Sequence, residues 1–156
     1  MPTIPDTKSW VSRLHDGQVD KAGAPYIGHV VRVFQRLLQA FPEACEDIQH
    51  AALLHDAIED CEITPQDLRN RGYSEKTIEI VEAVTKKPED GLTYAERIER
   101  LALSGNRGAI QVKICGLMDN SDPKRFSSLP EEKAASLSRR YQRALSVLTA
   151  SLEKSV

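Results

Sequence analysis

The chain has 156 residues, a length that suits one domain with a sizeable core, and its 21 Lys and Arg against 23 Asp and Glu give a net charge of −2. No basic stripe and no apolar run near the roughly 20 residues of a membrane span stand out, so we expect neither nucleic acid nor a membrane as a partner. Three widely spaced cysteines without a C-x-x-C pair, and an N-terminus without a signal pattern, favour reduced thiols in a cytoplasmic protein.

Apolar residues recur at spacings of three and four along most of the chain, which predicts an all-α fold. We expect a single domain over residues 1–156, with its core at about 7–150. The first half should hold a short helix at residues 7–16, a loop shaped by glycines, and a long helix from Pro25 to Pro42. The next helix should span residues 43–60.

Capping residues and prolines divide the second half of the chain in the same way. Thr64-Pro65 is a helix start, and Thr93-Tyr94-Ala95-Glu96 forms a capping box. We therefore expect helices at residues 65–70, 74–86, 93–103 and 130–154, with an apolar segment at 109–119.

The stretch A-A-L-L-H-D-A-I-E-D, residues 51–60, ends in four ionisable side chains: His55, Asp56, Glu59 and Asp60. Burying such groups on an apolar helix costs folding free energy unless they face a cleft and share a positively charged partner. On one continuous helix, Glu59 and Asp60 would follow His55 and Asp56 by one turn on the same two rows. This layout predicts a divalent metal site, with His55 and Asp56 as ligands and the two later carboxylates as acid/base or water-positioning groups.

His29 is the third candidate ligand, because it lies near the start of the long helix, 26 residues before His55. We interpret His15 and His50 as structural histidines. His50 would lie about 140° from His55 around the helix and would not face the same ion. Oxygen and imidazole ligands without thiolates suit Mn²⁺, and they leave Fe²⁺ and Zn²⁺ open.

His29, then His55-Asp56, then a later aspartate resembles the H…HD…D pattern of the HD-domain metal-dependent phosphohydrolases. The stretches G-Q-V-D-K-A-G-A-P-Y-I-G-H, A-A-L-L-H-D-A-I-E-D and V-T-K near residue 85 are similar to the hydrolase domain of RelA/SpoT-type enzymes, above all to its small stand-alone versions. These enzymes remove the 3′-pyrophosphate from the guanosine alarmones ppGpp and pppGpp. The resemblance covers roughly residues 7–150 and implies a multi-helix HD-domain bundle.

The resemblance also implies roles for individual residues. It implies that a manganese ion is held by His29, His55 and Asp56. Glu59 and Asp60 would position or activate the attacking water and would assist protonation of the leaving group. The nucleotide substrate would be contacted by Lys21, Asn120 and Tyr141, with Lys113 as a further group that balances substrate charge.

Two positions depart from the family pattern. The last motif has the form K-L-A-D-x-x-x-N, in which the Asp is the fourth metal ligand. Aligned on Lys113 and Asn120, it places Gly116, which has no side chain, at the ligand position. A second register would use Asp119 as the ligand but breaks the match at both ends, so we favour the first. Asp20 stands where alarmone hydrolases carry an arginine next to the lysine, so an anion replaces an anion-binding fork.

The sequence therefore predicts a metal-dependent phosphohydrolase that resembles a (p)ppGpp 3′-pyrophosphohydrolase, with activity weakened by Gly116. Two alternatives stay open. Gly116 motivates a nucleotide-binding or regulatory protein that has lost its chemistry, and Asp20 motivates an HD phosphohydrolase that acts on other nucleotides. The sequence also leaves open the natural substrate and the metal. It does not determine the oligomeric state, and an oligomer is one of the possibilities.

Overall fold

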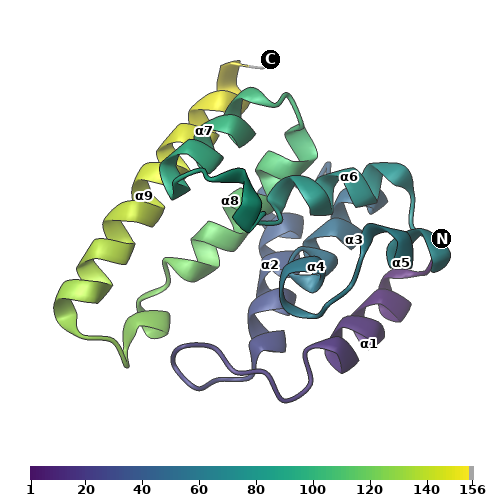
Figure 1. The fold of residues 1–156 in the computed structure, drawn as a ribbon, viewed down its shortest axis with the longest axis horizontal. Helices are drawn as coiled ribbons and strands as arrows, with labels where there is room; N and C mark the ends of the chain where they lie inside the picture. The colour runs from purple at the N-terminus through teal and green to yellow at the C-terminus, as the bar shows by residue number, and fades with distance from the viewer. Residues whose placement is uncertain (155–156) are drawn as a thin grey trace.

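The computed structural model describes residues 1–154, which form α-helices joined by short turns (Figure 1). The helices are α1 (Ile4–Leu14), α2 (Tyr26–Ala40), α3 (Glu46–Leu54), α4 (Ala57–Asp60), α5 (Pro65–Asn70), α6 (Glu75–Val84), α7 (Tyr94–Leu103), α8 (Arg107–Asn120) and α9 (Glu131–Lys154). Two 3-10 turns, η1 (Pro88–Asp90) and η2 (Pro123–Phe126), lie between them. The all-α prediction is confirmed. Within residues 1–154, no helix has the length and apolar character to cross a bilayer.

Side-chain caps set several of the helix starts. Thr64 and Thr93 each form a capping box with the acidic residue three positions later, so α5 and α7 begin where the sequence predicts. Thr3 does the same with Asp6. Because each cap satisfies backbone donors that would otherwise lack a partner, α1 starts at Ile4 and not at residue 7.

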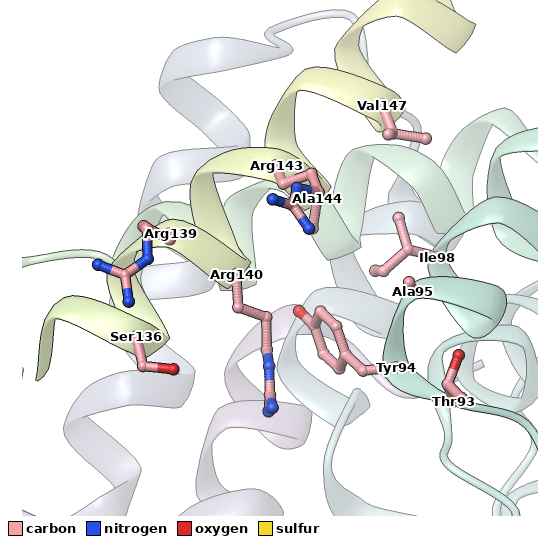
Figure 2. Close-up of a pocket in the computed structure, with 10 residues that line it drawn as sticks. All are labelled: Thr93, Tyr94, Ala95, Ile98, Ser136, Arg139, Arg140, Arg143, Ala144 and Val147. Atoms are coloured by element: carbon pink, nitrogen blue, oxygen red, sulfur yellow. The ribbon is translucent and has the colours of Figure 1, made fainter. Parts of the chain in front are cut away.

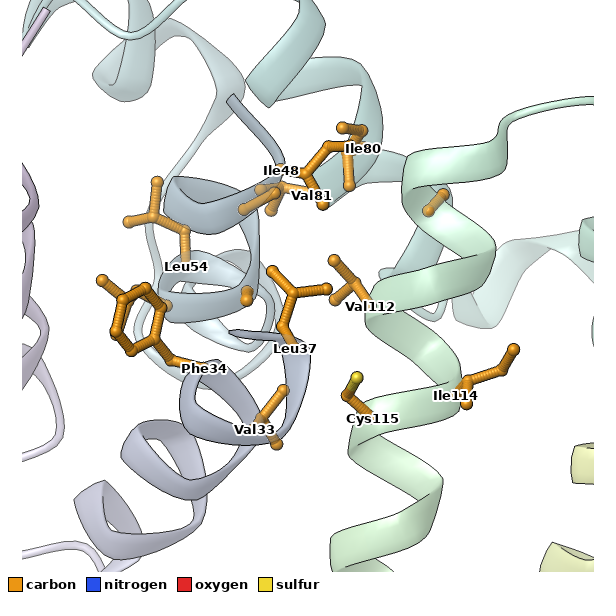
Figure 3. Close-up of a cluster of buried hydrophobic side chains, with 14 of the residues drawn as sticks. Val33, Phe34, Leu37, Ile48, Leu54, Ile80, Val81, Val112, Ile114 and Cys115 are labelled. Atoms are coloured by element: carbon orange, nitrogen blue, oxygen red, sulfur yellow. The ribbon is translucent and has the colours of Figure 1, made fainter. Parts of the chain in front are cut away.

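Helix α8 lies in the middle of the molecule. It packs against α2, α3 and α6 on one side and against α7 and α9 on the other. Figure 3 shows the side chains that fill the space between α8 and the first group, among them Leu37, Val81 and Val112. Because α8 has neighbours on both sides, residues 108–112 and 114–117 are all buried, which explains why this segment is apolar on every face.

The helix that the sequence predicts at residues 43–60 is interrupted in the structure. His55 and Asp56 form a turn between α3 and α4, and Asp56 has φ −104° and ψ 2°, outside the helical region. The carbonyl of Ala52, which a continuous helix would pair with the N–H of Asp56, accepts a hydrogen bond from His55 Nδ1 at 2.7 Å. The prediction of one continuous helix was therefore wrong at these two residues.

Candidate metal centre

His29 of α2 meets His55 and Asp56 of the α3–α4 turn in a single cluster. His55 Nε2 lies 2.9 Å from Asp56 Oδ2, and His29 Nε2 lies 3.7 Å from the same oxygen. One ligand atom from each of the three residues lies within 4.8 Å of the other two. The structure thus brings together the three residues that the sequence singled out as ligands.

Hydrogen bonds on the far side of each imidazole leave both Nε2 atoms facing the cluster. His55 Nδ1 donates to the Ala52 carbonyl, and His29 Nδ1 lies 2.7 Å from Asp119 Oδ2. A fixed partner on Nδ1 orients the ring and directs the lone pair of Nε2 at a cation. Two such imidazoles and one carboxylate form a donor set that fits a divalent metal ion.

The surroundings of the cluster favour a neutral His29 and an ionised Asp56. At His55, burial is outweighed by Asp56, which raises the pKa of His55, so a metal ion must displace a proton from His55. Burial lowers the pKa of His29, so its imidazole is neutral near pH 7. Burial opposes ionisation of Asp56, but His55, His29 and the Tyr26 hydroxyl outweigh it and lower the pKa of Asp56. The Tyr26 hydroxyl donates to Asp56 Oδ2 at 2.7 Å, a contact that sequence reasoning missed although Tyr26 belongs to the P-Y-I-G-H stretch.

Asp119 lies outside this cluster, on the Nδ1 side of His29. Its buried carboxylate accepts hydrogen bonds from Arg32 Nε at 2.7 Å and from an Arg125 guanidinium nitrogen at 2.9 Å. Burial opposes its ionisation, but His29 and Arg32 lower the pKa of Asp119 below its usual range. Neither arginine was predicted from the sequence. Arg32 follows His29 by three residues, a readable helical spacing, whereas Arg125 lies in η2, where no periodicity points to it.

Gly116 faces open space in the middle of α8, since a Cβ built there meets no atom within 4 Å. Lys113, one turn earlier, is half-buried, and burial lowers its pKa while Asp56 and Glu59 favour its charged form. Lys113 is therefore within electrostatic range of the cluster, and Gly116 follows it by three residues on α8. The register that places Gly116 at the fourth-ligand position stays a prediction.

Glu59 and Asp60 lie on α4, directly after the cluster. Glu59 Oε1 accepts a hydrogen bond from the backbone N–H of Lys86 at 2.7 Å, which joins α4 to the V-T-K segment. Burial, together with the charges of Asp56 and Glu59, raises the pKa of Asp60 to about 6. A carboxyl group with a pKa near neutrality can accept and return a proton under ordinary conditions.

The remaining residues that the sequence assigned to the substrate are Lys21, Asn120 and Tyr141. Residues 123–128 contact all three. Ser128 Oγ donates to the Lys21 carbonyl at 2.8 Å, Arg125 donates to Asn120 Oδ1 at 3.0 Å, and the Phe126 ring stacks on Tyr141 with centroids 6.4 Å apart. The η2 segment therefore connects the loop before α2, the end of α8 and the last helix.

Asp20 organises its own loop. Its Oδ1 accepts the backbone N–H groups of Ala22 and Ala24, at 2.9 and 3.0 Å, and its Oδ2 lies 3.8 Å from Arg125 Nε. The resemblance implies an arginine at residue 20. The structure instead brings the Arg125 guanidinium beside this position from a distant part of the chain.

Comparisons with known proteins identify the family of the chain. Residues 8–101 match the HD domain family. A guanosine-3′,5′-bis(diphosphate) 3′-pyrophosphohydrolase of Vibrio cholerae is 41% identical over 88 residues, which are 56% of this chain and 12% of the relative. A protein of the same name from Aquifex aeolicus is 32% identical over 112 residues, 68% of this chain and 15% of the relative. The matched segments thus span only 12–15% of these relatives.

A solved structure described as a metazoan ortholog of SpoT that hydrolyses ppGpp has the same fold. It superimposes with a TM-score of 0.75 at 22% sequence identity, and the match covers 99% of this chain and 94% of that one. The family match includes α2, the α3–α4 turn and α4, which carry the three clustered residues, and ends before α8. From this match and the geometry of the cluster, the chain belongs to the HD domain family.

Proposed function

We propose that the chain is a divalent-metal-dependent phosphohydrolase that removes the 3′-pyrophosphate from (p)ppGpp. The observation that carries this proposal is the convergence of His29, His55 and Asp56, with both Nε2 atoms directed at one point. The similarity to proteins named guanosine-3′,5′-bis(diphosphate) 3′-pyrophosphohydrolase supports the substrate class.

Each residue of the cluster has a distinct role in this proposal. His29, His55 and Asp56 would hold Mn²⁺, or Fe²⁺ or Zn²⁺, and such an ion supplies Lewis-acid activation of water and of a phosphoryl group. Asp119 would orient His29 through its Nδ1 and would not itself be a ligand.

The protons and the substrate charge would be handled by residues around the cluster. Asp60, whose pKa is raised to about 6, would accept the proton of the attacking water and return it to the leaving group. Glu59, held by the Lys86 N–H, would position the water. Lys113 would offset negative charge on the phosphates, and so would Lys21, which is exposed at the loop before α2.

The first test combines metal analysis with a panel of nucleotides. The Mn²⁺-loaded chain should release pyrophosphate from ppGpp, and it should leave GDP and GTP, which have no 3′-pyrophosphate, intact. Asp56→Ala should lose both metal and turnover. Glu59→Ala should keep the metal and lose turnover by roughly 10²-fold, because the attacking water loses the group that positions it.

Asp16→Ala serves as the control, because Asp16 is an exposed carboxylate outside the cluster. Turnover that survives in both Asp56→Ala and Glu59→Ala would contradict the assignment. Faster hydrolysis of a nucleotide without a 3′-pyrophosphate would favour an HD phosphohydrolase of other nucleotides, the reading that Asp20 motivates.

Gly116 supports a second candidate function, a nucleotide-binding or regulatory protein without turnover, because it leaves three protein ligands at the centre. In that case, the chain should bind ppGpp but fail to hydrolyse it with any of Mn²⁺, Fe²⁺ or Zn²⁺. Gly116→Asp should then create the missing activity.

A further inference from the structure

A groove of about 430 Å³ lies between α7 and α9, and none of the clustered residues of the candidate metal centre lines it. Figure 2 shows its two walls. Three arginines project from α9, and Tyr94 reaches across from α7 towards them. The floor is formed by Ile98 and Ala144, which are both buried.

The rim of this groove carries an uncompensated positive charge. Arg139, Arg140 and Arg143 are exposed, and no carboxylate lines the groove in the part of the chain that the structure describes. Arg143 follows the other two by four and three residues, so these like charges are neighbours on one helix face and repel one another. The sequence from 134 to 152 contains no acidic residue that could relieve this repulsion within α9.

Several arginines elsewhere in residues 1–154 form ion pairs with Asp or Glu, among them Arg32, Arg36, Arg69, Arg97 and Arg125. The groove is thus a place where three planar guanidinium forks, each able to bind phosphate through two hydrogen bonds, stand together without an anion.

Tyr94 adds an independent observation. Its hydroxyl is buried in the wall of the groove and has no hydrogen-bond partner among residues 1–154. Burial raises the pKa of this phenol to about 12, so it is a donor at neutral pH. The Arg140 guanidinium lies over the Tyr94 ring, 5.1 Å from its centroid. A buried donor without an acceptor is costly, and an oxygen-rich ligand would supply one.

The far end of the groove is apolar. Ile98, Ala144 and Ala95 lie there together with Val147, which is 38% exposed although it is a large hydrophobic residue. A ligand that matches both ends has several negative charges on one side and a flat, weakly polar body on the other. We propose that the α7–α9 groove binds a nucleoside polyphosphate, at a site separate from the candidate metal centre. This proposal does not depend on hydrolysis at that centre.

The test is isothermal titration in EDTA with three probes: GTP, inorganic triphosphate and guanosine. GTP should bind with saturation, triphosphate more weakly, and guanosine not detectably. Arg139→Ala/Arg143→Ala should weaken GTP binding at least tenfold, and Tyr94→Phe should weaken it a few-fold. The control Arg13→Ala/Lys154→Ala removes the same charge from exposed positions outside the groove and should bind as the unmodified chain does.

A further variant, Lys21→Ala, separates the groove from the candidate active site and should leave GTP binding intact. Loss of binding in Lys21→Ala with normal binding in Arg139→Ala/Arg143→Ala would overturn the proposal, and so would the absence of saturable GTP binding at millimolar concentration. Sedimentation that shows a dimer disrupted by the double variant, without GTP binding, would replace the proposed ligand by a second copy of the chain. Failure of ppGpp hydrolysis would leave this binding test unaffected.

Discussion

Gly116 stands, in the register that we favour, where the family motif has its fourth metal ligand. The position is buried, has ordinary helical geometry and leaves at least 4 Å around an added Cβ, so a side chain fits without displacing a neighbour. We predict that Gly116→Asp raises the affinity for Mn²⁺ and the rate of ppGpp hydrolysis, each by tenfold or more. Metal titration by calorimetry and a pyrophosphate-release assay check the two effects separately.

Gly116→Ala is the matched control for that prediction. It fills the same space and removes the same glycine from a helix interior, so it should stabilise the fold by roughly 0.5–1 kcal/mol through lower chain entropy in the unfolded state. It adds no oxygen ligand and should leave metal affinity unchanged. A rise in metal affinity with alanine equal to that with aspartate would refute the interpretation of Gly116 as a missing ligand.

Asp119 joins His29 to two arginines, and its removal should affect both stability and metal binding. In Asp119→Asn the amide keeps the shape but leaves Arg32, whose side chain is 42% exposed, and Arg125 without this anion, which should cost about 1–3 kcal/mol of folding free energy. His29 also loses the partner that orients it, so metal affinity should fall roughly 10- to 100-fold. Urea denaturation and Mn²⁺ titration measure these losses, and Asp122→Asn is a neighbouring control.

At the level of elements, α1 is held on α3 by a buried hydrogen-bond chain. Thr7 Oγ1 lies 2.9 Å from His50 Nδ1 and 2.6 Å from the Tyr73 hydroxyl. Burial lowers the pKa of His50, although the nearby carboxylates of Glu46 and Asp47 oppose this shift. His50 therefore contributes a structural contact, as the sequence predicts, and also a dependence of folding on pH.

The sign of that dependence follows from the lowered pKa. Below the unfolded-state pKa of about 6.5, His50 binds a proton in the unfolded chain but stays neutral in the folded chain. The contribution of His50 to the folding free energy is therefore full above this pH and is lost as the pH falls. Urea denaturation in EDTA at pH 7.5 and 5.5 should show a larger loss for the unmodified chain than for His50→Asn. Thr7→Val, which keeps His50, should retain the loss. Equal losses in all three proteins would count against the assignment.

Helix boundaries were predictable where a local device sets them. The capping boxes at Thr64 and Thr93 act within four residues and can be read directly from the sequence. The box at Thr3 is of the same kind, but the first helix was predicted to start only at residue 7. The turn at His55-Asp56 could not be read in this way, because apolar periodicity continues through a stretch whose interruption depends on a side-chain hydrogen bond to the Ala52 carbonyl.

At the scale of the whole molecule, the predictable part of the site is the part with close sequence spacing. Four ionisable residues lie within one six-residue stretch, so the sequence alone indicates that they belong to one site: His55, Asp56, Glu59 and Asp60. Arg125 reaches Asp119 and Asp20 only because η2 folds back over the loop before α2, and no spacing in the sequence encodes that contact. The groove between α7 and α9 could not be predicted from the sequence either, because its arginines and Tyr94 come together only when the two helices pack.

A cation at the centre would link helices that are distant in sequence through the side chains that bind it. His29 belongs to α2 and His55 and Asp56 to the α3–α4 turn, so the three ligand atoms are close only in the folded chain. An ion that binds the folded state alone stabilises it by RT ln(1 + [L]/Kd), about 2.7 kcal/mol at a hundredfold excess over Kd. We therefore predict that Mn²⁺ raises the Tm of the unmodified chain and that EDTA reverses the rise. His55→Ala should show no Mn²⁺ effect, and His15→Ala, which removes a histidine outside the cluster, should show the full effect. An equal rise in all three proteins would mean that the ion binds elsewhere.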